Sequence, residues 1–167
     1  HEALDEWKRF KGLCPVPDEL LPPLGTLGFS VQRYGMMNWG DLFTSRQKLA
    51  LKVFSESLRS LSHSLNVRDL MALCISKMVD MNNSLATWQP HAEIPAHMLT
   101  RFAVPIKWDF AEANPISNSS GTLESALKRT TEALPNIIAV QNTGTVQQAD
   151  ATNCPLPDNS VHVWFTD

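Results

Sequence analysis

The sequence predicts a helix-rich α/β fold, in which a small sheet of two to three strands near the C-terminus follows a helical insert. Two stretches of apolar residues with helical spacing, at 44–65 and at about 67–87, indicate a pair of helices. An alternating stretch at 146–149 and an apolar, β-branched and aromatic run at 161–166 indicate strands. Prolines, Asp and Asn between the two stretches mark a turn.

Length and composition fit one soluble structural domain. The chain has 167 residues, of which 43% are hydrophobic and 19% are charged. No apolar run is long enough for a transmembrane helix, so we expect no membrane partner, and the N-terminus has no signal-peptide pattern. The chain lacks an initiator Met and stops abruptly, which suggests a piece of a longer protein.

The net charge and the cysteines bear on partners and location. The formal net charge is −3, whereas a protein that binds duplex DNA unaided normally has a basic excess. Three cysteines lie far apart and form no Cys-x-x-Cys pair, so we predict no metal site and a reducing, cytoplasmic setting.

Residues 1–43 are expected to form an extended and irregular segment with a short helix at about 2–10. The part from 28 to 43 is rich in glycine and aromatic residues and carries Arg33 and Tyr34. Such side chains on a loop can stack on an extruded base or grip a nucleic-acid strand. The alternative is an irregular segment whose aromatic residues pack on neighbouring helices.

Residues 44–135 are expected to form the helical insert. A capping box formed by Thr44 and Gln47 starts the first helix. Opposed apolar stripes and a short connection indicate that the first two helices form an antiparallel pair. A third helix is expected from 121 to 134, with its end set by Pro135.

Two polar stretches in this insert are candidates for function. Asn82, Asn83 and Ser84 interrupt the second helix, and amides that face inward need partners, so they could order a loop or touch a substrate. An exposed polar face is the alternative. Trp108 and Asn114 belong to a loop dense in carboxylates, amides and aromatic residues, which fits the edge of a substrate pocket. A helix-capping loop is the other interpretation.

Residues 136–167 are expected to contain the strands, with Asp150 at the end of one and Asp167 at the end of the next. Ligands bind outside the carboxyl ends of strands in open α/β sheets, so Asp167 is well placed for chemistry. An ordinary β-turn-β edge is the alternative. An exposed final strand also invites pairing with a second copy, which would give a homodimer.

Two sets of residues resemble DNA methyltransferases. Leu156–Val161 (LPDNSV) followed by Thr166 and Asp167 resembles the signature of the amino-group DNA methyltransferases, in which Pro-Pro-Tyr comes next. Residues 28–47 and Trp108–Pro115 (WDFAEANP) resemble the large adenine-specific DNA methylases that carry a zinc ribbon. The likeness covers most of the chain in the same order.

The resemblance implies a partial Rossmann-like methyltransferase sheet and a defined chemistry. The enzyme would transfer a methyl group from S-adenosylmethionine to an exocyclic amine of a flipped base, most simply adenine N6. Asp167 would accept an N–H of that amine, and Asp150 would contact the adenine ring of the methyl donor. Trp108, Asn114, Arg33 and Tyr34 are candidates for contact with the DNA substrate.

The resemblance also implies what this chain lacks. In the family, the glycine-rich loop for S-adenosylmethionine and the zinc ribbon lie upstream, so the chain looks like an internal segment and is expected to be inactive alone. The alternative function is a helical module that binds DNA or a partner protein without a catalytic role.

Overall fold

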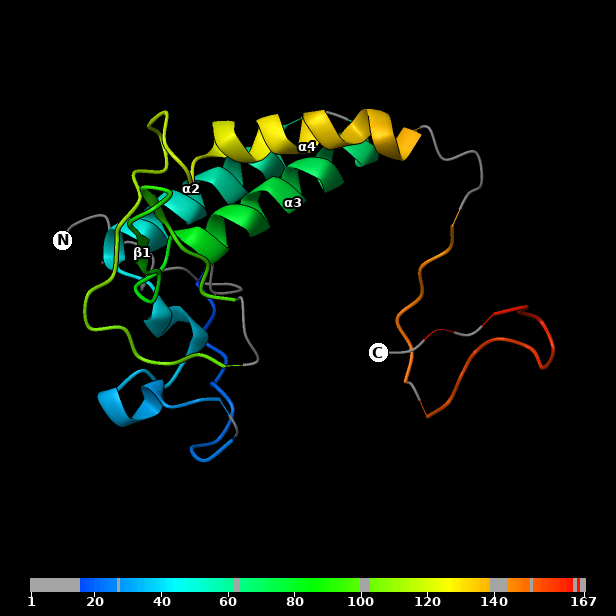
Figure 1. The fold of residues 1–167 in the computed structure, drawn as a ribbon, viewed down its shortest axis with the longest axis horizontal. Coiled ribbons are helices and arrows are strands. Elements are labelled where there is room, and N and C mark those ends of the chain that lie inside the picture. Colours follow the sequence, from blue (N-terminus) through cyan, green and yellow to red (C-terminus); the bar gives the residue numbers. More distant parts are fainter. Residues whose placement is uncertain are drawn as a thin grey trace. The chain divides into compact units, whose positions relative to one another are not determined.

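A computed structural model describes most of the chain, and its residues form two compact units, 1–134 and 135–167 (Figure 1). The described residues are 16–26, 28–61, 64–99, 103–138, 144–150, 152–163 and 165. The helix-rich part of the predicted fold class is confirmed, because the described residues form the helices α2 (Ser45–Ser60), α3 (Leu65–Met81) and α4 (Leu123–Ile138). The predicted N-terminal helix at about 2–10 lies outside the described residues.

Helix α2 spans Ser45–Ser60, and its predicted capping box is confirmed. The Thr44 hydroxyl accepts from the Gln47 backbone N–H at 3.3 Å, and the Gln47 side-chain oxygen accepts from the Thr44 N–H at 2.8 Å. Two of the orphan donors at the helix start are thereby satisfied. The capping box therefore fixes where α2 begins.

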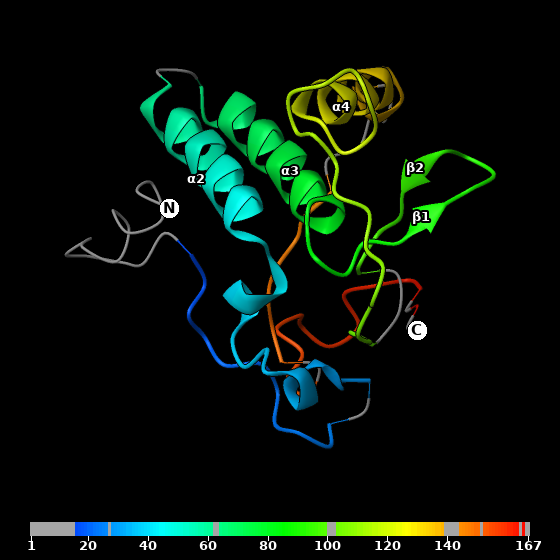
Figure 2. The same cartoon turned by 90° about the vertical axis from the view of Figure 1, so that its left-hand side faces the viewer.

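Helix α3 spans Leu65–Met81 and runs antiparallel beside α2 (Figure 2), as predicted. The helix ends earlier than the predicted residue 87. The side-chain amide of Asn82 donates to the carbonyl of Met78 at 2.8 Å, and that of Asn83 donates to the carbonyl of Asp80 at 2.9 Å. These amides satisfy carbonyls that the next helical turn would otherwise use, so the backbone can leave the helix here.

Helix α4 spans Leu123–Ile138 and packs on α3 through its first turns. The Cys74 thiol lies 3.3 Å from the Thr130 hydroxyl, and Ala126 is buried in the same interface. The predicted end at residue 134 was wrong, because Pro135 lies inside the helix. A proline near a helix end removes one backbone hydrogen bond, and the last turn tolerates this loss better than the helix centre does.

The strands differ from the prediction. The described residues contain one two-stranded antiparallel sheet, β1 (Trp88–Gln89) and β2 (Ile94–Pro95), with Trp88 opposite Pro95. No strand is formed in 144–150, in 152–163 or at 165, so the strands predicted there were wrong over these residues. A strand needs a hydrogen-bonded neighbour, and the described part of this unit supplies none. The predicted sheet edge for a homodimer is therefore not found there.

The main hydrophobic core lies under the segment from 28 to 43. Its buried members are Leu21, Val31, Leu42, Leu85, Met98 and Val104. The segment is not merely extended, because it forms two 3₁₀ helices, η2 (Val31–Tyr34) and η3 (Trp39–Leu42). Both short helices are anchored by fully buried side chains of this core. The core therefore fixes the position of Arg33 and Tyr34.

Candidate functional site

The two runs that carry the family resemblance, 28–47 and 108–115, touch each other in the first unit. The rings of Tyr34 and Trp108 meet edge to face, with centroids 4.9 Å apart and planes at 84°. Further along, Glu112 accepts hydrogen bonds from Thr44 and Arg46. Segments far apart in the chain thus build one surface. We call this contact region the paired-run surface.

The aromatic pair on this surface is open to solvent. Trp108 is 78% exposed and Tyr34 is 49% exposed, although the neighbouring Val31 is fully buried. Gly35 follows Tyr34 with a φ of 87°, and its N–H donates to the Gln32 carbonyl, so η2 ends in a defined turn. An edge-to-face pair leaves ring faces free, and a planar ligand could stack on them. Arg33, which precedes Tyr34 in η2, is also exposed.

The same surface continues into an ion pair at the start of α2. Both carboxylate oxygens of Glu112 accept from the Arg46 guanidinium, and the Thr44 hydroxyl donates to one of them at 3.1 Å. The hydrogen bond from Arg46 lowers the pKa of the Glu112 carboxyl, and the Thr44 hydroxyl adds to this effect. The carboxylate is therefore ionised at neutral pH.

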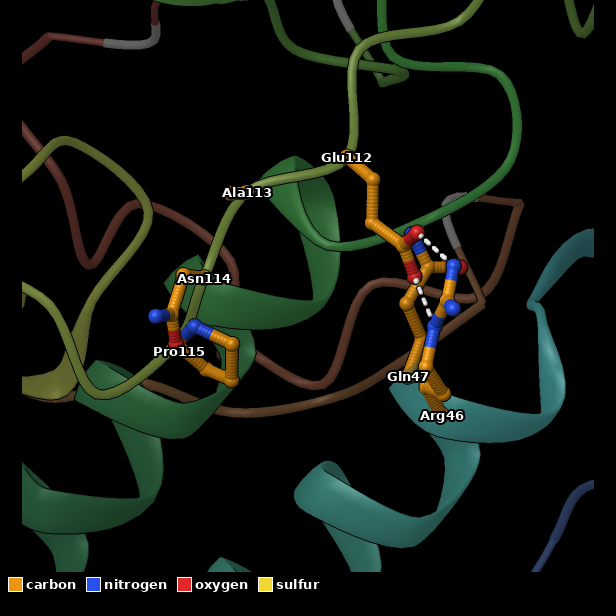
Figure 3. A pocket seen from close by; sticks show the side chains of 6 residues that line it. All are labelled: Arg46, Gln47, Glu112, Ala113, Asn114 and Pro115. Carbon is orange, nitrogen blue, oxygen red and sulfur yellow. Dashed lines mark hydrogen bonds and ion pairs between the residues drawn. The ribbon is translucent and has the colours of Figure 1, made fainter.

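A pocket with a volume of about 290 Å³ adjoins this ion pair (Figure 3). Its lining residues are Arg46, Gln47, Glu112, Ala113, Asn114 and Pro115. Asn114 belongs to the predicted substrate residues, and its side-chain oxygen accepts from the Ile116 N–H at 3.2 Å. Gln47 is only 3% exposed, and its Nε2 has no hydrogen-bond partner among the described residues. The sequence marks Gln47 as a capping residue and gives no sign of this second position.

Of the two carboxylates predicted to act in the site, the structure describes Asp150 but not Asp167. Asp150 belongs to the second unit and is exposed, and it accepts from the Thr152 N–H at 2.9 Å and from the Thr152 hydroxyl at 2.8 Å. The Thr152 backbone N–H lowers the pKa of Asp150, followed by the hydroxyl. The residue lies in a local turn and not at the end of a strand, so that part of the prediction was wrong. Asp167 lies outside the described residues.

The polar stretch after α3 faces inward. Asn82 is 1% exposed and also donates to the Gly121 carbonyl at 2.6 Å, which ties the end of α3 to the start of α4. The Asn83 side-chain oxygen accepts from the Leu85 N–H, and the Ser84 hydroxyl donates to the Leu42 carbonyl. These contacts correspond to the loop-ordering alternative. The exposed polar face is excluded for Asn82 and Asn83.

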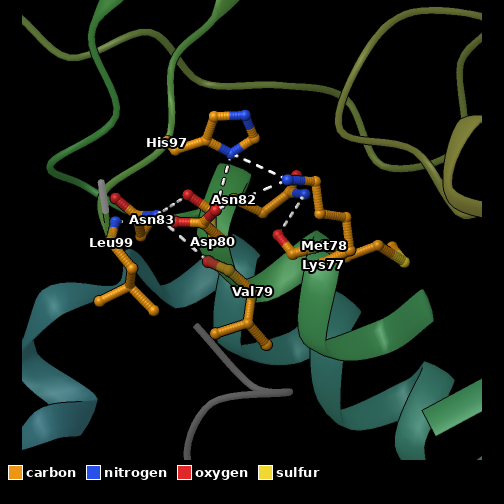
Figure 4. Close-up of polar contacts among 8 residues, drawn as sticks. All are labelled: Lys77, Met78, Val79, Asp80, Asn82, Asn83, His97 and Leu99. Atoms are coloured by element: carbon orange, nitrogen blue, oxygen red, sulfur yellow. Dashed lines mark hydrogen bonds and ion pairs between the residues drawn. The ribbon is translucent and has the colours of Figure 1, made fainter. Parts of the chain in front are cut away.

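Sequence reasoning missed a His–Asp pair at the end of α3 (Figure 4). His97 Nδ1 lies 2.6 Å from Asp80 Oδ2, and the Leu99 N–H donates to Asp80 Oδ1 at 2.8 Å. Lys77 Nζ lies 3.2 Å from the same His97 nitrogen and 3.8 Å from Asp80 Oδ2, so the three side chains form one polar cluster. Asp80 thereby holds the segment after β2 against α3. Within the described ranges, no group of three or more His, Cys, Asp or Glu side chains is arranged to hold a metal ion.

Comparisons of the chain with protein-family models, with curated proteins and with solved structures give no match. Among the described residues, no helix combines the length and the apolar character that crossing a bilayer requires.

Proposed function

We propose that this chain is a segment of an S-adenosylmethionine-dependent DNA methyltransferase that acts on an exocyclic amino group, most simply adenine N6. One observation carries the proposal: the two runs on which the resemblance rests, 28–47 and 108–115, contact each other through Tyr34–Trp108 and through Arg46–Glu112. Residues that serve one site are expected to meet in space. The order of the Leu156–Val161 motif and Asp167 gives the second support.

The chemistry follows from what an aromatic amine lacks. The nitrogen lone pair of such an amine is delocalised into the base, so the amine is a poor nucleophile. The Asp167 carboxylate would accept an N–H and localise the lone pair on nitrogen. The nitrogen would then form its bond to the methyl carbon as the bond between that carbon and the sulfonium sulfur of the donor breaks, and the amine would release one N–H proton. No covalent enzyme intermediate is needed. S-adenosylmethionine supplies the methyl group when bound, and Asp150 is the weaker candidate for contact with its adenine ring.

The paired-run surface would contact the bases of the DNA. Exposed aromatic rings stack on bases of any sequence, because every base has a π face. Tyr34 and Trp108 would provide this stacking, and Arg33 and Asn114 are the polar candidates on the same two runs. Because the net charge is −3, we expect stacking to contribute more of the affinity than phosphate neutralisation does.

The proposal includes a cytoplasmic location. Cys74 and Cys154 are free thiols in the described residues. Free thiols persist in a reducing compartment, which fits an enzyme that modifies cellular DNA.

The experiment that tests the surface is Trp108→Ala in the 167-residue chain. Loss of one stacking platform weakens binding by about 1–3 kcal/mol per base, or roughly 5- to 150-fold. Fluorescence anisotropy of a labelled single-stranded oligonucleotide at low salt would measure the change. Tyr34→Ala is expected to weaken binding in the same direction, since its ring supports the Trp108 ring.

The matched control is Trp88→Ala, because Trp88 is a half-exposed tryptophan that lies on β1 outside both runs. Its loss is expected to leave the affinity within about twofold, since exposed residues away from a binding site contribute little. Equal losses for Trp88→Ala and Trp108→Ala would refute the surface, as would no binding of the unchanged chain at low salt.

A specific observation favours the second candidate, a helical binding module without a catalytic role. Helix α3 exposes large apolar side chains, with Leu65 at 72% and Leu73 at 64% exposure. A contiguous patch of exposed apolar side chains is typical of a protein-binding face. A methyl-transfer assay distinguishes the two candidates, because only the first one predicts transfer of a methyl group.

A further inference from the structure

The pocket at the amino end of α2 is rich in hydrogen-bond donors. Arg46 lies in the first turn of α2, where the backbone N–H groups give the helix end a partial positive charge. The Arg46 guanidinium has five N–H donors, and the two hydrogen bonds to Glu112 leave others unused. The Asn114 amide and the Gln47 amide add further N–H groups to the lining. A ligand with several acceptor oxygens fits such a lining.

Gln47 gives independent support for a ligand. Gln47 is only 3% exposed, and its side-chain oxygen already accepts a hydrogen bond from the Thr44 N–H in the capping box. Its Nε2 is buried and has no partner among the described residues, and Gln47 is one of the residues that line the pocket. A buried donor without an acceptor destabilises a protein, so such a group indicates an acceptor that the free chain does not supply.

The contacts of Glu112 show that a negatively charged group is stabilised at this pocket. Its carboxylate already receives the Arg46 guanidinium and the Thr44 hydroxyl at the helix start (Figure 3). Its contacts favour the ionised form. A group with a carboxylate's charge and oxygen spacing is therefore stabilised there, and phosphate shares both properties.

We propose that this pocket binds a phosphate oxyanion and that the Glu112 carboxylate occupies the donors of Arg46 while the pocket is empty. The inference rests on the proposed function, which makes a nucleic-acid backbone phosphate the ligand beside the Tyr34–Trp108 pair. When phosphate binds, Glu112 turns away and the Arg46 guanidinium hydrogen bonds to two phosphate oxygens. The Nε2 of Gln47, which neighbours Arg46 on α2, donates to a further oxygen. Glu112 thus competes with the ligand within the same chain.

The test compares substitutions of Arg46 and Glu112, which are expected to change the affinity for an oligonucleotide in opposite directions. Arg46→Ala is expected to weaken binding of a single-stranded oligonucleotide about tenfold, because charge-assisted hydrogen bonds to phosphate are lost. The slope of log affinity against log salt should fall by about 1. Glu112→Gln is expected to strengthen binding about threefold or more, because the competing carboxylate is removed. A purely structural ion pair predicts the same direction for both variants.

Two controls on α2 separate the pocket from general charge effects. Arg59→Ala removes a positive charge at the other end of the helix, and Glu56→Gln breaks the exposed Lys52–Glu56 ion pair. Each is expected to change affinity less than twofold, because exposed charges outside the contact are screened. If Arg46→Ala does not fold, Arg46→Lys keeps the charge but loses the planar fork, and it should still weaken binding.

Inorganic phosphate distinguishes the two sources of the ligand. If the site takes a backbone phosphate, inorganic phosphate should raise the melting temperature of the Glu112→Gln protein less than the oligonucleotide does. An equal rise would assign the site to a free phosphate.

The inference is overturned if Arg46→Ala behaves like Arg59→Ala while Trp108→Ala still weakens binding, and the proposed function would then survive. If neither the unchanged chain nor Glu112→Gln binds the oligonucleotide, both the inference and the role of the paired-run surface are overturned.

Discussion

Leu42→Ala is expected to lower the free energy of unfolding by about 2–5 kcal/mol, which is typical of a buried leucine replaced by alanine. Leu42 has no exposed surface and packs in the main core with Val31 and Leu85. Its carbonyl also accepts from the backbone N–H and the hydroxyl of Ser84, both at 2.8 Å. The cavity left by this substitution would lie in the core that anchors η2, the short helix that contains Tyr34.

Urea denaturation measures this effect as a lower midpoint with an unchanged slope. Leu73→Ala is the matched control, since Leu73 is 64% exposed on α3. Its effect should stay within about 0.5 kcal/mol. A Leu42→Ala effect as small as that of Leu73→Ala would contradict the assigned core. Oligonucleotide binding should weaken with Leu42→Ala under conditions in which a large fraction of the protein is unfolded.

Asp167→Asn is expected to reduce methyl transfer by a factor on the order of 10² to 10³, because an amide no longer supplies the negative charge that polarises the amine. The assay is transfer of a labelled methyl group from S-adenosylmethionine to adenine-containing DNA. It should use the complete gene product, since the resemblance assigns the S-adenosylmethionine loop to a segment outside this chain.

Asp69→Asn serves as the control because Asp69 is an exposed acidic residue on α3. It should retain full activity and the same affinity for DNA. Full activity of Asp167→Asn would remove Asp167 from the chemistry. Equal loss in both variants would mean that the effect is not specific to the proposed acceptor.

The sequence predicts local features of this fold well. The Thr44–Gln47 capping box and the apolar stripes of α2 and α3 depend on residues within one or two helical turns. The end of α3 was not predictable in this way. Asn82 leaves the helix with the help of a hydrogen bond to Gly121, and that partner lies far along the chain.

The strands were also not predictable from local sequence alone. Residues 161–166 have strand-like composition, but a strand exists only where another strand supplies hydrogen bonds. In the described residues Val163 is 81% exposed and Phe165 is 92% exposed. Composition predicts the preference of a segment, whereas pairing depends on its neighbours.

The candidate site was predictable as a set of residues but not as an arrangement. Tyr34 and Trp108 stand out in the sequence as aromatic residues in polar loops, yet nothing local predicts that their rings meet. The pairs Arg46–Glu112 and Asp80–His97 were not predicted from the sequence as site residues or as contacts. Contacts between distant segments follow from packing on the shared core.

Photo-crosslinking tests the central claim most directly, namely that the paired-run surface contacts nucleic acid. The protein would be irradiated with a single-stranded oligonucleotide that contains 5-iododeoxyuridine, and crosslinked peptides would be identified by mass spectrometry. We expect crosslinks at Trp108 and Tyr34, because exposed aromatic rings that stack on a base lie within reach of it. Crosslinks confined to peptides outside 28–47 and 108–115 would contradict the claim.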